Sequence, residues 1–186
     1  MRKLFNTILI VSISILFVQC GKDKYTISKG KVGELTTETT IEQLDKIFAK
    51  DSIVKILSEG AKGNYSFQDE DEYQIYEKGG KHLLTIVPKQ ELDSTSTIKS
   101  IEIFDERYAT ESGLNIKSSF REINANNAIS KIETSFKSAT IFIDDLNATI
   151  SIDKEQLGLA DFSMQKVSIE QIPDLAKVKS FIVWFN

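Results

Sequence analysis

The stretch Ile98-Lys99-Ser100-Ile101-Glu102-Ile103-Phe104 returns in similar form near the end of the chain, as Val178-Lys179-Ser180-Phe181-Ile182-Val183-Trp184. Short runs rich in β-branched and aromatic residues predict β-strands. The second run continues to the last residue as Phe181-Ile182-Val183-Trp184-Phe185-Asn186, which is almost entirely apolar. This favours a strand in the middle of a sheet over an exposed binding patch. The repeated strand indicates that the chain contains one structural unit twice.

A glycine turn opens each copy upstream of these strands. The first copy begins with Val32-Gly33-Glu34-Leu35 and the second with Ser112-Gly113-Leu114-Asn115-Ile116. Gly33 and Gly113 are separated by the same stretch of chain as the two repeated strands. Glycine reaches backbone conformations with positive φ at no steric cost, so both positions predict turns.

A short helix is expected after each turn. Thr39 with Glu42, and Ser119 with Glu122, have the spacing of a capping box, in which a hydroxyl residue begins a helix and an acidic side chain closes back on it. The first helix would then place three apolar residues on one face, namely Ile41, Leu44 and Phe48.

Extended segments complete each copy. A strand is expected at 52–57 and at 128–134, followed by a hairpin that turns at Gly79-Gly80 or at 144–147. The hairpin strands would be 73–76 with 82–87, and 139–143 with 148–152. A further short helix is expected at 169–176.

The predicted fold class is α+β, with a duplicated helix-plus-three-strand unit forming a mainly antiparallel sheet and the helices packed on one face. Two such units give about six strands. The alternative is a chance likeness among short strand patterns. Residues 31–186 are interpreted as a single globular domain of two tandem repeats, at about 32–104 and 112–185.

The first residues have the pattern of an export signal. Arg2 and Lys3 precede an apolar run from Leu4 to Val18. This run is about 15 residues long, shorter than the roughly 20 that a helix needs to cross a bilayer. Residues 1–19 are therefore interpreted as a lipoprotein signal peptide, and residues 20–30 as a lipidated N-terminus and tether.

Cys20 is the only cysteine of the chain and follows this apolar run directly. Its context, Phe17-Val18-Gln19-Cys20-Gly21, resembles the lipobox of bacterial lipoproteins, with a looser sequence of the kind found in Bacteroidetes. The resemblance implies that the thiol of Cys20 receives a diacylglycerol and that the lipid, palmitate included, anchors the protein to a membrane. The alternative is an ordinary secretory signal with an incidental cysteine.

The expected location is the cell envelope, with a lipid anchor in the outer membrane. Gly21-Lys22-Asp23-Lys24 partly resembles the tags that send some lipoproteins to the cell surface, but with a single acid in it a solvated tether is the preferred interpretation. The formal net charge of −4 lacks the basic excess of nucleic-acid-binding proteins. The expected partners are therefore the membrane, through Cys20, and another protein of the envelope.

Residues from Val32 to about Ile123 are similar to an uncharacterised family of bacterial lipoproteins regulated by the envelope-stress sigma factor. The similarity lies in Val32-Gly33-Glu34-Leu35-Thr36, in the strand Ile101 to Phe104, and in Ser112-Gly113-Leu114-Asn115-Ile116. It covers about half of the chain and contains no catalytic signature, so it implies a location and a fold rather than an activity.

His82, the only histidine, is predicted at the start of a strand beside the Gly-Gly turn, as a surface residue of a hairpin. A general base needs a nucleophile or an orienting carboxylate within reach, and no motif supplies one. No catalytic residue is therefore predicted, and the chain is interpreted as a non-enzyme.

Metal and cofactor motifs are also lacking in the sequence. Asp69-Glu70-Asp71-Glu72 does not have the spacing of a calcium loop, and a solvated loop entering a strand is the preferred interpretation. Asp144, Asp145 and Asn147 are explained by turn chemistry. Gly60-Ala61-Lys62-Gly63 lacks the pattern of a phosphate loop, so no cofactor is predicted.

Three functions remain open. The leading one is a non-enzymatic envelope lipoprotein that binds or supports another envelope component. The alternative is a lipoprotein that binds a small molecule or glycan in a groove between the repeats. The third is a hydrolase with an unusual pair of carboxylates, which would need two acids close together in a cleft.

Overall fold

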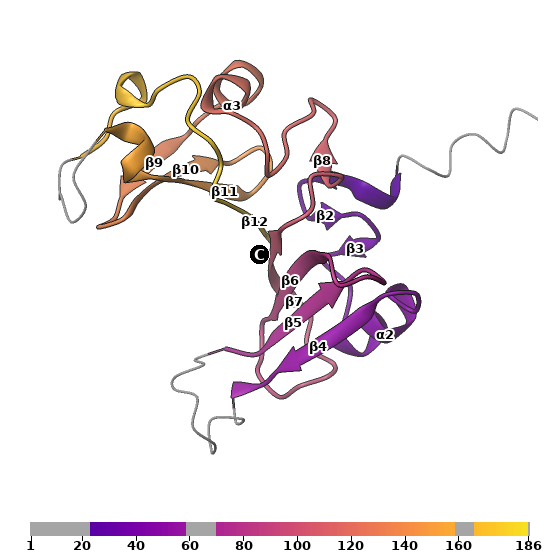
Figure 1. Cartoon of the computed structure of the whole chain (residues 1–186). Helices are drawn as coiled ribbons and strands as arrows, with labels where there is room; N and C mark the ends of the chain where they lie inside the picture. The colour runs from indigo at the N-terminus through magenta and orange to yellow at the C-terminus, as the bar shows by residue number, and fades with distance from the viewer. Residues whose placement is uncertain (1–22, 59–69, 159–165, 186) are drawn as a thin grey trace, which may run out of the picture.

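The computed structural model describes residues 23–58, 70–158 and 166–185. Within these ranges the chain forms a mainly antiparallel α+β fold with little helix. A long sheet has the strand order β4-β5-β6-β7-β12-β11-β10-β9, and a small sheet has the order β3-β2-β1-β8 (Figure 1). β1 pairs with β8 in parallel, whereas the strand pairs of the long sheet are antiparallel.

The long sheet consists of two halves of four strands each. The first half comprises β4 (Ser52–Ile56), β5 (Glu72–Tyr76), β6 (His82–Pro88) and β7 (Ile98–Ile103). The second half comprises β9 (Lys131–Thr134), β10 (Ser138–Ile143), β11 (Ala148–Asp153) and β12 (Ser180–Trp184). β7 pairs with β12, so the two halves join edge to edge.

The sheet is wider than predicted. Each half contains four strands instead of three, namely the strand expected at 52–57 or 128–134, the two hairpin strands and the repeated strand, so the long sheet has eight strands instead of about six. β12 is flanked by β7 and β11, which confirms that the C-terminal strand is central. Its Phe181 and Val183 are fully buried.

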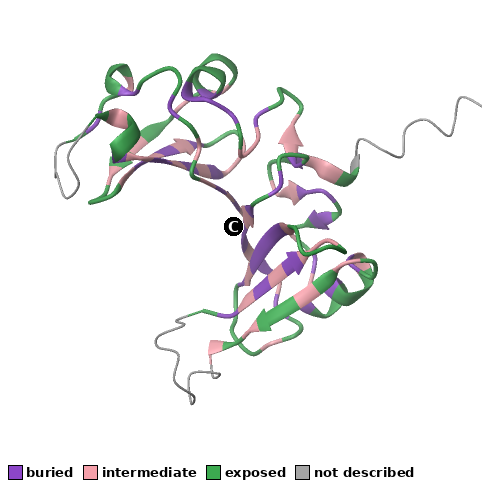
Figure 2. Ribbon diagram, in the orientation of Figure 1, coloured by how far each residue is buried: buried purple, intermediate pink, exposed green. Residues whose placement is uncertain are grey.

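One face of the long sheet is buried across its six inner strands, whereas the outer strands β4 and β9 carry no buried residue. Side chains of a strand alternate between the two faces, and Figure 2 shows this alternation as buried and partly exposed residues along the strands. A continuous row on the buried face crosses from the first half to the second: Ile75, Leu84, Ile103, Phe181, Ile150 and Ile141. Burial of one such side chain stabilises the fold by about 1.5–3 kcal/mol.

The two halves have matching registers. Leu84 of β6 faces Ile103 of β7, and Ala148 of β11 faces Val183 of β12. Ile103 and Val183 are separated by the same stretch of chain as Gly33 and Gly113. The first strands pair with the hairpins in corresponding ways in both halves.

Short helices cover the buried face. η3 (Ile41–Gln43) runs directly into α2 (Leu44–Ile47), and α3 spans Phe120–Asn126. The apolar side chains of these helices belong to the same buried cluster as the covered face of the sheet: Ile41, Leu44, Phe48, Phe120 and Ile123.

The start of α3 agrees with the sequence prediction. The hydroxyl of Ser119 donates to Oε2 of Glu122 at 2.8 Å, and the backbone N–H of Ser119 donates to the same oxygen at 2.7 Å. Ser119 also forms an isolated bridge with Lys177, which ties the start of the helix to the segment before β12.

The capping box predicted at Thr39 in the first copy is wrong by one residue. Thr40 is the N-cap of η3, and its N–H donates to Oε1 of Gln43. Thr39 instead accepts the N–H of Thr36 through its hydroxyl oxygen, within the preceding turn. Thr40 bridges Thr97, as Ser119 bridges Lys177 in the second copy.

The small sheet begins inside the predicted tether. Residues 26–30, assigned to the tether from sequence, form β1 (Thr26–Ser28) and the turn into β2 (Lys31–Val32), after a short 3-10 turn, η2 (Asp23–Tyr25). β3 (Leu35–Thr36) and β8 (Ala109–Thr110) complete the sheet. Ile27 is buried at the centre of β1, so this segment belongs to the globular domain.

Gly33 and Gly113 occupy turns with positive φ, of 58° and 86°, which confirms both predicted turns. At Gly33 a Cβ atom would lie 2.5 Å from the backbone oxygen of Lys24, so this turn also needs glycine for lack of space.

The helix predicted at 169–176 is much shorter. Only η6 (Ile169–Gln171) forms there, as a single 3-10 turn, and η5 (Lys154–Leu157) is a second such turn after β11. Pro173 explains the early end, because a proline disfavours helical geometry in the residue before it. Ile172 accordingly has an extended backbone, with φ −83° and ψ 119°.

Candidate functional site

The second face of the long sheet, called the open face here, carries side chains that are partly exposed. In β10, Thr140 and Phe142 alternate with the fully buried Ile141 and therefore lie on this face. Neighbouring strands contribute Thr149, which is paired in register with Phe142, and Ile182, which is paired with Thr149. The open face is thus where partly exposed aromatic and polar side chains gather.

A pocket of about 350 Å³ lies on the open face of the second half. We call it the second-half pocket, and it is lined by Thr140, Phe142, Asp144, Asn147, Ala148, Thr149 and Trp184. Its residues come from β10, from the hairpin turn, from β11 and from β12. The pocket therefore lies beside the strand that joins the two halves.

Hydrogen bonds fix the geometry of this pocket. The indole Nε1 of Trp184 donates to the hydroxyl oxygen of Thr149 at 3.1 Å. The side-chain amide of Asn147 donates to the backbone oxygen of Trp184 at 2.9 Å. Asn147 has a φ of 49°, a left-handed conformation that asparagine tolerates in tight turns. The turn predicted from Asp144 to Asn147 therefore also positions the tryptophan.

The corresponding place in the first half is filled by a stack of rings. His82 lies between Tyr76 and Phe104, with ring centroids 4.6 Å and 3.9 Å away, and we call these three residues the first-half stack. Nε2 of His82 also lies 3.1 Å from the hydroxyl of Thr85. Gln74 accepts a hydrogen bond from Tyr76, so polar groups here satisfy one another.

His82 is a partly buried residue rather than the surface residue predicted. Burial lowers the pKa of His82, and the backbone oxygen of Leu84 and the carboxylates of Glu102 and Glu72 oppose this effect. The imidazole is held by stacking and by Thr85, which is a packing role. The hydroxyl nearest to Nε2 is that of Thr85, a residue of β6 that is only 7% exposed.

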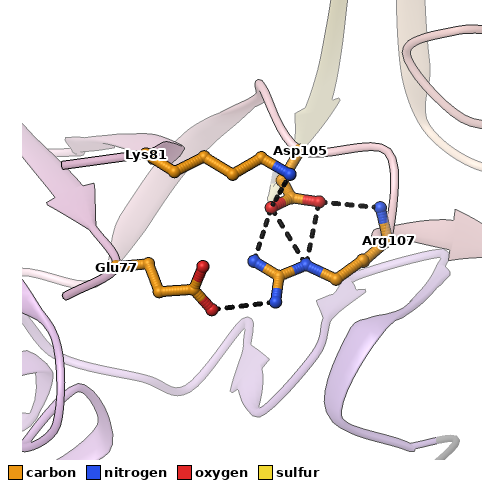
Figure 3. A network of polar contacts seen from close by, with 4 residues as sticks. All are labelled: Glu77, Lys81, Asp105 and Arg107. Atoms are coloured by element: carbon orange, nitrogen blue, oxygen red, sulfur yellow. Dashed lines mark hydrogen bonds and ion pairs between the residues drawn. The ribbon is translucent and has the colours of Figure 1, made fainter. Parts of the chain in front are cut away.

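A buried acid, Asp105, lies at the end of β7 and organises a charged network (Figure 3). Its carboxylate is fully buried, and the guanidinium of Arg107 donates to both of its oxygens, at 2.6–3.0 Å. The ammonium of Lys81 lies 2.9 Å away. Arg107 also binds Glu77 at 2.8 Å, so the network ties the β5–β6 turn to the segment after β7.

The electrostatics of this network are those of a structural clamp. Burial would raise the pKa of Asp105, but hydrogen bonds from Arg107 and Lys81 outweigh it and bring the pKa to about 2. The guanidinium of Arg107 also lies over the ring of Tyr25, 4.9 Å from its centroid, and Tyr25 packs edge-on against Tyr108. The clamp therefore ties η2, which leads into the small sheet, to the segment between β7 and β8.

The acidic run at 69–72 is not simply a solvated loop. Asp71 is fully buried, and its carboxylate accepts the backbone N–H groups of Ser58 at 2.8 Å and Leu92 at 2.6 Å. Burial acts to raise the pKa of Asp71, but these hydrogen bonds lower it overall. Asp69 itself lies outside the described residues. Sequence reasoning missed Asp71 and Asp105, because acids in the loops next to strands usually face water.

Other predicted sites are located as follows. Cys20, the predicted lipidation site, and Gly60 to Gly63 lie outside the described residues. Within the described ranges, no three His, Cys, Asp or Glu side chains converge in a way that could hold a metal ion. None of the helices in those ranges is both long and apolar enough to span a membrane.

Comparisons with known proteins show similarity in fold alone. No family model matches the chain, and no curated protein matches it. Among solved structures, it resembles the uncharacterized protein yfeY from Escherichia coli, with a TM-score of 0.58 and 16% sequence identity. The match covers 86% of this chain and 99% of the yfeY chain. At this level of identity the likeness supports the fold and leaves the activity open.

Proposed function

We propose that this chain is a non-enzymatic lipoprotein of the cell envelope, anchored through Cys20 to the outer membrane, which binds another envelope protein. The observation that carries this proposal is the difference between the two faces of the long sheet. One face is covered by helices and the small sheet, whereas the open face presents partly exposed apolar side chains. Val54 and Phe104, for example, are 46% and 41% exposed.

The proposed anchor would lie on the covered side. Asp23, where the described chain begins, is three residues after Cys20, and an extended chain spans at most about 3.6 Å per residue. Val32 of the small sheet and Phe48 of α2 border the same small cavity, so the small sheet lies beside α2. A lipid on Cys20 would therefore leave the open face directed away from the bilayer and accessible to a partner.

The lipid is tested by metabolic labelling with palmitate. We expect label on the native chain and none on the Cys20→Ala variant, because the variant lacks the only thiol. A secreted, unlabelled native protein would contradict the anchor.

The partner is tested by photocrosslinking in cells. A photoreactive residue at Val54 or Phe104 on the open face should capture one enriched envelope protein, and the matched position Asn124, exposed on α3, should not. Capture from Asn124 alone would place the interaction on the covered side and contradict the proposal. Weaker capture in the Cys20→Ala background would show that anchoring brings the partners together.

We also propose that the two halves of the long sheet arose by duplication of one unit. Support comes from the matching registers, from the equivalent bridges of Thr40 and Ser119, and from the constant offset along the chain between β7 and β12. The test replaces residues 178–184 with the sequence of residues 98–104. This chimera should fold cooperatively, whereas the same graft moved by one residue should not, because it exchanges the two faces of the strand.

A second candidate function is the binding of a small molecule or glycan, which the sequence placed in a groove between the repeats. The second-half pocket favours it, since its volume lies within the range of small-ligand sites. The two halves are joined by paired strands, and the pocket lies on the second-half side of that boundary. Saturable binding of a small ligand there would establish this candidate.

A further inference from the structure

The second-half pocket combines two aromatic side chains with oxygen-bearing groups. Trp184 and Phe142 are both partly exposed, and each lies on the open face. The rim is formed by the exposed carboxylate of Asp144, by the amide of Asn147 and by the hydroxyl of Thr140. Such a site offers a flat apolar surface next to hydrogen-bonding groups, so a ligand must have both an apolar face and polar edges.

The remaining hydrogen-bonding capacity of the rim consists mainly of acceptors. Ser130 donates to Oδ1 of Asp144, and among the described contacts the second carboxylate oxygen is left to accept. Asn147 uses one N–H of its side-chain amide for the backbone oxygen of Trp184, which leaves the amide oxygen and the second N–H for a ligand. A ligand that fits must therefore donate hydrogen bonds. A phosphate dianion offers mainly acceptors and would be repelled by Asp144, while the ammonium of Lys131, which lies over the ring of Phe142 at 5.3 Å from its centroid, is already paired with Glu133.

We propose that the second-half pocket binds one pyranose ring of a neutral saccharide. The face of the ring formed by C–H groups would lie against Trp184, with Phe142, whose ring is contacted by the ammonium of Lys131, beside it, and the hydroxyl groups would donate to Asp144 and Asn147. A pyranose has the required combination of an apolar face, hydroxyl donors and no charge. This inference rests on the second candidate function and is independent of the protein partner.

The first half explains why only one of the two equivalent places would bind. There the polar side chains bond to one another, Tyr76 to Gln74 and Gln74 to Glu72, and His82 fills the space between two rings. In the second half Trp184 bonds to Thr149, and a cavity is left beside it.

The chain contains its own reporter, because Trp184 is its only tryptophan. Glucose, galactose, mannose, N-acetylglucosamine and their short oligomers are titrated into the full-length protein in detergent, and the tryptophan fluorescence is followed. We expect a saturable change with at least one neutral sugar and none with glucose 6-phosphate. Equal or tighter binding of the phosphate would overturn the proposal.

Two neighbouring acids provide a matched pair of variants. Asp144→Ala should weaken sugar binding by about tenfold or more, because it removes a charged hydrogen-bond acceptor. Asp145→Ala makes the same change of charge one residue away, outside the lining, and should bind like the native protein. Trp184→Phe, followed by saturation-transfer NMR of the sugar, should also bind more weakly. Thermal unfolding shows that each variant is folded.

The outcomes distinguish the saccharide proposal from the broader proposal that the pocket binds a small molecule. Equal affinity of the two acid variants, or no saturable change with any sugar, overturns the saccharide proposal. In that case amino acids and nucleosides are titrated in the same way. A saturable response to one of them that is lost in Asp144→Ala would show that the pocket binds a small molecule of another class. If none of these compounds gives a saturable response, the ligand-binding function is contradicted as well.

Discussion

The two halves of the long sheet have the same strand order and register but different open faces. In the first half Tyr76, His82 and Phe104 stack on one another. In the second half the place of Phe104 is taken by Trp184, and a pocket remains. The pairing register of a strand is set by which of its residues face the core, and both halves bury equivalent positions, so their strands pair in the same register. The uncovered face carries no such constraint, and this is where the halves differ.

A second difference lies directly after β7 and β12. Asp105 and Phe185 occupy equivalent positions of the two copies, and both are fully buried. Asp105 is paired with Arg107 and Lys81, whereas Phe185 joins the apolar cluster. Equivalent positions of one architecture can thus be stabilised by a buried ion network or by apolar packing.

The largest effect is expected from removing the strand that joins the halves. Deleting residues 181–186 should prevent folding, because it removes a central strand with three fully buried side chains, Phe181, Val183 and Phe185. Thermal unfolding followed by circular dichroism should show no cooperative transition. A truncated chain with unchanged melting would mean that the first half folds without the second.

Breaking the ion network should have the next largest effect. Asp105→Asn should lower the free energy of unfolding by about 2 kcal/mol, since it removes charge-assisted hydrogen bonds. Arg107 and Lys81 are 36% and 52% exposed and can regain water, so the loss should remain below that of a fully buried pair. Urea unfolding at neutral pH measures the change. An effect as small as that of a surface acid such as Asp145→Asn would show that the network does not stabilise the fold.

The pH dependence of stability gives a check with a definite sign. The pKa of Asp105 is about 2 in the folded protein, against an ordinary value of 3.8, so the unfolded chain takes up this proton first as the pH falls. The stabilisation is complete above the ordinary value and is lost between about pH 4 and pH 2. Asp105→Asn should therefore lose less stability than the native protein over that interval.

The N-caps of α3 and η3 should differ in how much their hydroxyl groups stabilise the protein, by about 1 kcal/mol. Ser119→Ala should destabilise the protein by about 1 kcal/mol, because the hydroxyl of Ser119 bonds to Glu122. The hydroxyl of Thr40 is buried and has no hydrogen-bond partner within the described structure. Thr40→Val should therefore be close to neutral or slightly stabilising. Equal losses in the two variants would show that both hydroxyls cap their helices in solution.

The smallest effect concerns the lone imidazole of the first-half stack. Burial holds the pKa of His82 below its ordinary value of 6.5, and Phe104→Ala should raise it towards that value by exposing the ring. NMR titration of the only histidine measures both values directly. As the pH falls below about 6.5 the unfolded chain binds this proton first, so the native protein should lose a little stability there. An unchanged pKa in the variant would mean that Phe104 does not shield His82.

The repeated strands, the glycine turns and the cap of α3 could be predicted because each depends on local chemistry. A glycine such as Gly33 favours a turn with positive φ, and a serine followed three residues later by a glutamate, as at Ser119, favours a helix start. Alternating apolar residues favour a strand with one face in the core. The N-cap of η3 was predicted one residue too early, because Thr39 and Thr40 are adjacent and each carries a hydroxyl that can cap a helix. The helix expected at 169–176 does not form in full because Pro173 acts on the residue before it.

By itself, the sequence determined the α+β class, the antiparallel strands and the central position of the last strand, since these follow from the periodicity of apolar residues along the chain. Tertiary structure alone decided that Asp71 and Asp105 are buried, that His82 is stacked, and that Trp184 borders a pocket. Each of these features depends on groups distant in the chain, such as Leu92 for Asp71 and Thr149 for Trp184. No local pattern encodes them, because the partner of a side chain is set only when the sheet brings the two strands together.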